Sequence, residues 1–114
     1  MRRLRVELQP EALRDLADIF RIVLHVSQNV PTAQGFVKRI RDRCQRIGDA
    51  PRGGRPRDDL EPGLRTVPFE NTAVIAYRIE PGRVLVTNVF YGGRDFEALY
   101  RSDSGEDATT PSRD

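Results

Sequence analysis

The chain has 114 residues, of which 38% are hydrophobic and 32% are charged, and its formal net charge at pH 7 is +2. This length suits a single domain, the composition is ordinary for a soluble protein, and the absence of a long apolar run excludes a membrane-spanning chain. A single cysteine, Cys44, and a single histidine, His25, exclude an internal disulfide and the usual zinc sites. The N-terminal MRRLRVELQP lacks the apolar core of a signal peptide, so we expect a cytoplasmic protein.

Charge is unevenly distributed along the chain. Residues 102–114 carry four acidic side chains and one arginine, a net charge of −3, which leaves +5 for residues 1–101. Within that part, residues 38–57 hold eight basic and two acidic side chains, a net charge of +6. Such a stretch attracts an acidic partner, either a nucleic acid or an acidic protein segment. Because 18 of the 19 basic residues are arginine, a coding bias explains the stretch equally well.

The first elements in chain order are a strand and a long helix. In RLRVEL, residues 3–8, apolar and charged residues alternate, which predicts a half-buried strand. Pro10 suits the first turn of a helix, where its missing N–H has no partner anyway. The helix should end near Asn29, because Pro31 disfavours helical geometry at the residue before it. Its predicted apolar stripe, with a serine as a weak last member, is Leu13, Leu16, Phe20, Val23, Leu24 and Ser27.

A second helix follows and should form an antiparallel hairpin with the first, because the connector is short. Pro31 and Thr32 begin this helix, and Gly48 is expected to cap its C-terminal end. His25 lies off the stripe of the first helix and is expected on the surface. The apolar stripe of the second helix is Ala33, Phe36 or Val37, Ile40, Cys44 and Ile47.

The second half of the chain predicts a loop, three strands and a short helix. Residues 49–63, DAPRGGRPRDDLEPG, are rich in proline and glycine, so we expect a loop with exposed arginines. The segments 64–69, 73–79 and 83–91 predict an antiparallel meander. RDFEALYR at 94–101 predicts a short helix that ends a domain of residues 1–101. The polar segment 102–114 predicts a disordered acidic tail.

These elements define an α+β fold of order β-α-α-β-β-β, with the helical hairpin packed on one face of a small, mainly antiparallel sheet and a short C-terminal helix. Strict alternation places Val74, Ala76 and Arg78 together on one face of their strand, and Val86 and Phe90 together on one face of theirs. Both faces of these two strands are largely apolar, and the hairpin can cover only one of them. A second copy, a partner segment, or the chain's own terminal helix and loop must cover the other.

Few residues are suited to catalysis. The chain has no phosphate-binding loop of the G-x-x-x-x-G-K-[ST] type, and Cys44 falls on an apolar stripe. We therefore expect no metal and no cofactor. Metal-free RNA cleavage can use an arginine to stabilise phosphate charge and a tyrosine to move a proton. Taken singly, Arg94 is explained as well by an ion pair with Asp95, and Tyr100 by a packing role. The groups available for such chemistry are Arg65, Arg78, Arg94, Tyr91 and Tyr100.

Several motifs occur in a characteristic order between residues 3 and 101. They are LQPEALRDLADI after the first strand, AQGFVKRIRDRCQRIGDAPRGGRP in the second helix and loop, then EPGLRTVPF, VIAYRIE and VLVTNVFYGGRDFEAL. In this order and spacing they resemble the ParE/RelE superfamily of toxins from bacterial type II toxin–antitoxin operons. The resemblance implies the fold described above and a role in plasmid maintenance or the stress response.

The two activities of the superfamily imply different site residues. RelE-like members are metal-independent, ribosome-dependent mRNA endonucleases, and Arg65, Arg94 and Tyr100 match part of their site. Val67 and Val74 occupy positions where further basic residues are expected, and their presence would remove most of the positive field. The GGRP loop and the YGGRD ending also look more like ParE-like members, which act on DNA gyrase. We therefore favour a gyrase-inhibiting toxin that is not an enzyme; an endoribonuclease and a non-toxic or degenerate protein-binding module are the alternatives.

The resemblance also implies partners. A cognate ParD-like antitoxin with an acidic C-terminal segment is expected to neutralise the toxin, and DNA gyrase is the expected target. We expect no membrane association and no sequence-specific DNA binding by this chain alone. The predicted antitoxin contacts are Val74, Ala76, Arg78, Val86 and Phe90. The predicted target contacts are Arg94, Tyr91, Arg55 and Arg57.

Overall fold

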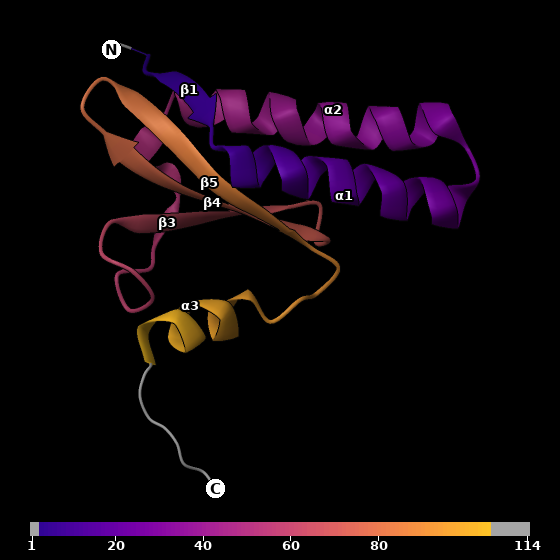
Figure 1. Cartoon of the computed structure of the whole chain (residues 1–114). Coiled ribbons are helices and arrows are strands. Elements are labelled where there is room, and N and C mark those ends of the chain that lie inside the picture. The colour runs from indigo at the N-terminus through magenta and orange to yellow at the C-terminus, as the bar shows by residue number, and fades with distance from the viewer. Residues whose placement is uncertain (1–2, 106–114) are drawn as a thin grey trace, which may run out of the picture.

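A computed structural model describes residues 3–105 of the chain. It places a hairpin of two long helices on one side of a five-stranded sheet and a short helix on the other side (Figure 1), which confirms the predicted α+β class. None of the described helices is long and apolar enough to cross a membrane. The elements are β1 (Arg5–Leu8), α1 (Pro10–Ser27), α2 (Val30–Ile47), the 3-10 helix η1 (Pro51–Gly53), β2 (Arg55–Pro56), β3 (Leu64–Phe69), β4 (Ala73–Glu80), β5 (Arg83–Tyr91) and α3 (Phe96–Gly105).

The strands are ordered β1-β5-β4-β3-β2 across the sheet. β1 runs parallel to β5, and every other neighbouring pair is antiparallel, as in the predicted meander. The parallel pair requires a crossover, which the helical hairpin supplies. The predicted loop 49–63 is only partly irregular, because it contains η1 and the edge strand β2.

The two helices begin and end close to the predicted positions. α1 ends at Ser27, and Gln28 follows in the left-handed conformation with φ of 55°. Asn29 then caps α2, because its side-chain oxygen accepts a hydrogen bond from the backbone N–H of Thr32 at 2.8 Å. Gly48 is the C-cap residue of α2, as predicted. Its φ of −61° lies in the right-handed helical region, which residues other than glycine also adopt. A side chain at Gly48 would collide with the backbone carbonyl of Leu4, so close packing rather than backbone freedom requires the glycine.

The predicted stripe of α2 is confirmed, whereas that of α1 is partly wrong. Ala12, Leu16 and Ile19 are the buried residues of α1, and Leu13 is 45% exposed. α1 packs against both α2 and β5, so its buried arc is centred on Ala12 and Ile19, which the predicted stripe omits. His25 is exposed, as predicted.

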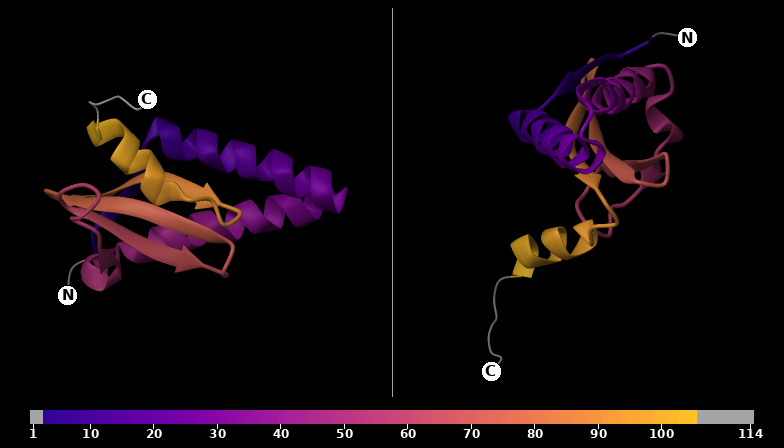
Figure 2. Two further views of the ribbon diagram at one scale, coloured as in Figure 1. Left: turned by 90° about the horizontal axis from the view of Figure 1, so that it is seen from below. Right: turned by 90° about the vertical axis from the view of Figure 1, so that its right-hand side faces the viewer.

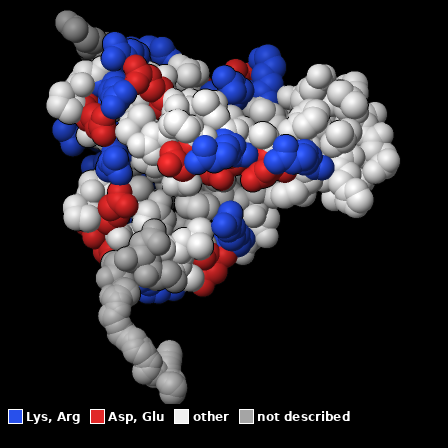
Figure 3. All heavy atoms as spheres, viewed as in Figure 1, with Lys and Arg blue, Asp and Glu red and all other residues white. Residues whose placement is uncertain are grey.

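The far end of the hairpin extends beyond the sheet (Figure 1). No strand covers this part of α1, and Ile22 and Val26 are 47% and 78% exposed. Val30, at the start of α2, is 48% exposed. The visible side of the tip of this overhang carries no charged side chain (Figure 3).

One irregularity in β5 changes which side chains share a face of the sheet. The register between β4 and β5 shifts between Ala76 and Tyr77, so Thr87 is an extra residue opposite this step. A bulge of this kind moves every later side chain to the other face. Val86 and Val89 therefore both belong to the core beneath the helices, while Phe90 belongs to the cluster on the opposite face. The predicted grouping of Val86 with Phe90 on one face is wrong for this reason.

Tyr77 fixes the loop after α2 to the sheet. Its hydroxyl donates a hydrogen bond to the carbonyl of Pro51 at 2.6 Å and accepts one from the N–H of Gly54 at 2.9 Å. Tyr77 is fully buried, and a side chain at Gly54 would collide with its hydroxyl. Burial raises the pKa of this phenol, although the hydrogen bond from Gly54 and the charges of Arg65 and Arg43 oppose the rise.

Candidate functional site

The second face of the sheet, on the side away from the hairpin, is covered by α3 (Figure 2). Leu64, Ala76 and Phe90 form a buried cluster there, and Phe96 and Tyr100 of α3 pack against it. The rings of Phe96 and Phe90 are stacked with centroids 5.1 Å apart, and Tyr100 meets Phe90 edge to face at 6.2 Å. The chain's own terminal helix is therefore the cover, one of the three possibilities that the sequence leaves open.

This cover removes most of the predicted antitoxin surface. Ala76 and Phe90 are 0% and 5% exposed beneath α3, and Val86 is 0% exposed beneath the helical hairpin. The expectation that these three side chains form an uncovered apolar face is wrong, because α3 packs over Ala76 and Phe90 and Val86 lies on the hairpin side of the sheet. Val74 and Arg78 remain half-buried, and Arg78 forms an ion pair with Glu61 at 2.6 Å.

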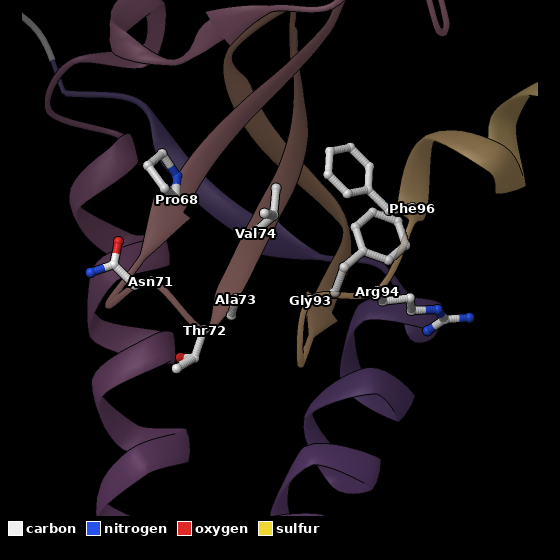
Figure 4. A pocket seen from close by; sticks show the side chains of 9 residues that line it. Pro68, Asn71, Thr72, Ala73, Val74, Gly93, Arg94 and Phe96 are labelled. Atoms are coloured by element: carbon white, nitrogen blue, oxygen red, sulfur yellow. The ribbon is translucent and has the colours of Figure 1, made fainter.

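A pocket of about 230 Å³ lies at one end of this second face. The apolar part of its wall is formed by Val74, Phe90 and Phe96. Phe96 and Val74 point toward the pocket, and Arg94 projects at its rim (Figure 4). The Arg94 guanidinium lies 5.8 Å from the centroid of the Phe90 ring, in a cation–π contact. The remaining lining residues are Pro68, Asn71, Thr72, Ala73 and Gly93. This combination suits an apolar side chain that lies next to a negative charge.

Arg94 is a predicted contact residue that the structure leaves available. It is exposed, and none of the ion pairs between described residues includes it. Gly92 and Gly93 precede it with φ of 81° and 73°, a backbone that favours glycine and turns the chain sharply after β5. Asp95, the predicted ion-pair partner, lies within 4.0 Å of Arg101 instead.

The other predicted target contacts differ in their surroundings. Arg55 is exposed on the edge strand β2, opposite Thr66 of β3. Tyr91 is half-buried, and its ring meets that of Phe36 edge to face at 5.7 Å. Arg57 is only 8% exposed, so the expectation that all loop arginines are exposed is wrong for this residue.

Arg57 is buried because it binds two carboxylates. Its Nε and Nη2 donate to the two oxygens of Asp59, and its Nη1 lies 2.7 Å from Glu97 of α3. These bonds lower the pKa of Asp59. Nothing in the local sequence indicates that Glu97 contacts the loop; within α3 it also lies 3.8 Å from Arg101, four residues on.

The three residues of the predicted endoribonuclease site do not converge. Arg65 lies on the hairpin side of the sheet, where its guanidinium donates to the carbonyls of Arg52 and Gly54 at 3.0 and 2.8 Å. Tyr100 lies on the opposite side, and its hydroxyl is buried without a hydrogen-bond partner among the described residues. Burial raises the pKa of this phenol, and the negative charge of Glu61 adds to the rise. Such a group is poorly placed to exchange a proton with a substrate.

Metal and thiol chemistry also lack a site in the described part of the chain. No group of three or more His, Cys, Asp or Glu side chains there could hold a metal ion. Cys44 is buried in the core, and burial raises the pKa of its thiol to about 11. Such a thiol is almost entirely protonated at neutral pH, so it is a packing residue rather than a nucleophile.

The fold of this chain is shared with a solved structure, and its sequence matches a known family. The structure resembles a solved chain described as "Chromosomal ParDE TA system from P. aeruginosa", with a TM-score of 0.68 and 18% sequence identity. The match covers 78% of this chain and 96% of that chain, so the two share their fold. No curated protein sequence matches the chain.

The family is identified by sequence. Residues 6–96 match the family described as "ParE toxin of type II toxin-antitoxin system, parDE". The chain therefore belongs to the ParE toxin family. The matched range ends at the first residue of α3, so most of the helix that covers the second face lies beyond it.

Proposed function

We propose that this chain is the toxin of a type II toxin–antitoxin module, that it inhibits DNA gyrase in the cytoplasm, and that a cognate ParD-like antitoxin neutralises it. The observation that carries the proposal is the family match over residues 6–96, together with the shared fold. The separation of Arg65 from Tyr100 on opposite sides of the sheet argues against the endoribonuclease. Plasmid maintenance or a stress response would be the cellular role.

Arg94 and the adjoining pocket are the contact surface we propose for the target. Arg94 is exposed and has no carboxylate partner among the described residues, so a carboxylate of a partner protein can bind it without breaking an existing pair. Val74 in the pocket wall offers apolar contact beside it. Arg55 and Tyr91 are proposed as further target contacts. Arg57 holds α3 in place instead, so we assign it no direct contact.

We propose that an acidic segment of the antitoxin binds this chain. Val74 and Arg78 are the accessible part of its predicted contact set. Arg78 shares Glu61 and Glu80 within the chain, so an acidic partner would have to compete with these carboxylates. A small ribbon-helix-helix protein with an acidic tail, encoded next to this chain, would be the partner to co-express and purify.

The proposal is tested by inducing the chain alone in a bacterial host while DNA breaks and protein synthesis are followed together. We expect DNA breaks, filamentation and the DNA-damage response while translation continues, and inhibition of supercoiling by purified gyrase. A prompt arrest of translation with intact DNA would instead establish the endoribonuclease. Normal growth at high expression would establish a non-toxic binding module.

A matched pair of variants tests the contact surface. Arg94→Ala should retain the unfolding midpoint and lose toxicity, because it removes an exposed cation with only a ring contact. Arg14→Ala removes another exposed arginine, which lies on α1 at 3.8 Å from Glu11, and should stay toxic. If Arg94→Ala unfolds the domain, its role is structural.

A further inference from the structure

The arginines within residues 3–105, the part of the chain that the structure describes, fall into two groups according to their ion pairs. One group has a carboxylate within 4.0 Å and consists of Arg3, Arg5, Arg14, Arg21, Arg39, Arg57, Arg78, Arg83 and Arg101. The other group has no such ion pair with a described residue. Two of its members lie apart, Arg41 on the opposite flank of α2 and Arg94 beyond β5. The remaining five, which we call the arginine cluster, are Arg43, Arg46, Arg52, Arg55 and Arg65.

The arginine cluster is brought together by the loop that Tyr77 fixes to the sheet. Arg65 donates to the carbonyls of Arg52 and Gly54, so these backbones meet at the edge of the sheet. Arg55 follows on β2, opposite Thr66. The charges of Arg65 and Arg43 both act on the hydroxyl of Tyr77, which binds η1 through Pro51. The cluster therefore spans the last turns of α2, η1 and the β2 edge.

Arg43 and Arg46 extend the cluster along α2. They are three residues apart on the flank of the helix that also carries Arg39. Arg39 is bound to both carboxylate oxygens of Glu70, so the arginine cluster does not extend along α2 as far as Arg39. Arg46, Arg52 and Arg55 are exposed, whereas Arg43 and Arg65 are half-buried.

The acidic residues near the cluster are already engaged. Asp49 binds Arg3 at 2.8 Å. Asp59 gives both of its oxygens to Arg57, although Arg55 also contributes to its lowered pKa. Asp58 accepts a hydrogen bond from the N–H of Gly63 at 2.8 Å. The cluster therefore carries more positive charge than the acidic residues beside it balance, which builds a positive potential at this edge.

We propose that the arginine cluster binds the phosphate backbone of duplex DNA without reading its sequence. Repeated, regularly spaced phosphates match several separate guanidinium groups better than a single carboxylate does. The large exposed hydrophobic side chains of the described residues, Leu13, Ile22, Val26, Val30 and Leu99, all lie outside the cluster. A protein partner needs such apolar anchors for tight binding, whereas backbone contact to DNA is mainly electrostatic.

This inference goes beyond the proposed function, because gyrase need not be present for the contact to form. A toxin that acts on a DNA-bound enzyme would gain affinity from a second contact to the DNA itself. The arginine cluster lies on α2, η1, β2 and β3, whereas Arg94 lies in the turn after β5. Each can therefore be altered separately.

The test measures binding of the purified full chain to a fluorescently labelled short duplex DNA of mixed sequence over a series of salt concentrations. We expect salt-dependent binding that is the same for duplexes of different sequence. Arg46→Gln with Arg55→Gln should weaken binding by more than about tenfold at low salt and lower the salt slope by about 2. Arg14→Gln with Arg21→Gln removes the same charge from α1 and should change binding by less than about twofold. Arg65 is left intact because it holds the loop.

Three results would overturn the inference. Equal weakening by the two double variants would mean that only net charge matters. No salt-dependent binding by the folded chain, checked by circular dichroism, would mean that the cluster does not bind DNA. Stronger binding of a polyglutamate peptide than of DNA, lost in the Arg46/Arg55 variant, would assign the cluster to an acidic protein segment. None of these results decides whether the chain inhibits gyrase, which the supercoiling assay measures.

Discussion

Arg57 and Glu97 form an ion pair with 2.7 Å between Nη1 of the arginine and Oε2 of the glutamate. Arg57 comes from the loop before β3 and Glu97 from the first turn of α3, so the pair links two segments that lie far apart in the sequence. The side chain of Arg57 is 10% exposed and also binds Asp59. The position of α3 over the second face of the sheet therefore depends partly on an arginine of the loop.

Arg57→Ala is expected to loosen α3. The change leaves Asp59 and Glu97 without their cation and removes a buried side chain, so we expect the free energy of unfolding to fall by about 1–2 kcal/mol. Urea denaturation measures this loss, and faster amide hydrogen exchange in α3 locates it. Arg55→Ala, two residues away and exposed, should change stability by less than about 0.5 kcal/mol. Equal losses in the two variants would contradict the role of the ion pair.

Hydrophobic periodicity was sufficient to predict the long helices and the four main strands of this fold, but not η1 or the edge strand β2. The alternation in RLRVEL predicts β1, and the spacing of Ala33, Ile40, Cys44 and Ile47 predicts the buried side of α2. Such patterns depend only on the local period of 2 or 3.6 residues, which the chain itself carries. Proline and glycine also act locally, through their backbone geometry, so they indicated the ends of the helices and the turn between β4 and β5.

The candidate site was less predictable, because it depends on contacts between distant segments. Nothing local in RVLVTNVFY shows that Thr87 is a bulged residue, so strict alternation placed Phe90 with Val86. The burial of Arg57 follows from Glu97, and the burial of Ala76 from the docking of α3. The availability of Arg94 could be anticipated, since the two glycines before it indicate a turn at the surface.

Tyr77→Phe should detach the loop after α2 from the sheet without altering the core. The variant keeps the buried ring but leaves the N–H of Gly54 and the carbonyl of Pro51 without their shared partner. We expect a loss of about 1–2 kcal/mol in the free energy of unfolding, measured by urea denaturation. Tyr91→Phe, which removes the hydroxyl of a half-buried tyrosine, is the control and should have a smaller effect. Unchanged stability of Tyr77→Phe would show that water replaces these bonds.

Glu70→Gln should give a stability difference that depends on pH. Arg39 donates to both oxygens of Glu70 at 2.9 and 3.0 Å, and these bonds lower the pKa of that carboxyl in the folded state. A lowered folded pKa means that the contribution is present above the unfolded pKa, about 4.3, and is lost as the pH falls through the folded pKa.

The glutamine variant should therefore unfold at a lower temperature than the unaltered chain at neutral pH, and the two midpoints should approach each other in acid. Thermal unfolding followed by circular dichroism across this pH range measures the gap. Glu11→Gln is the control, because its partner Arg14 lies 3.8 Å away in an exposed pair and should give a smaller gap. A gap for Glu70→Gln that stays constant with pH would exclude ionisation of Glu70 as its cause.

Tyr100→Phe separates the structural role of this residue from a catalytic one. The hydroxyl is buried without a hydrogen-bond partner among the described residues, while the ring packs on Phe90. Removing only the hydroxyl should leave the free energy of unfolding unchanged or raise it by up to about 1 kcal/mol, because an unpaired buried polar group is costly. Toxicity should be unchanged as well, since the packing of α3 is preserved. Tyr100→Ala removes the ring too and should cost about 1–3 kcal/mol. If Tyr100→Phe folds normally and growth inhibition disappears, the hydroxyl takes part in chemistry, and the endoribonuclease becomes the better account of this toxin.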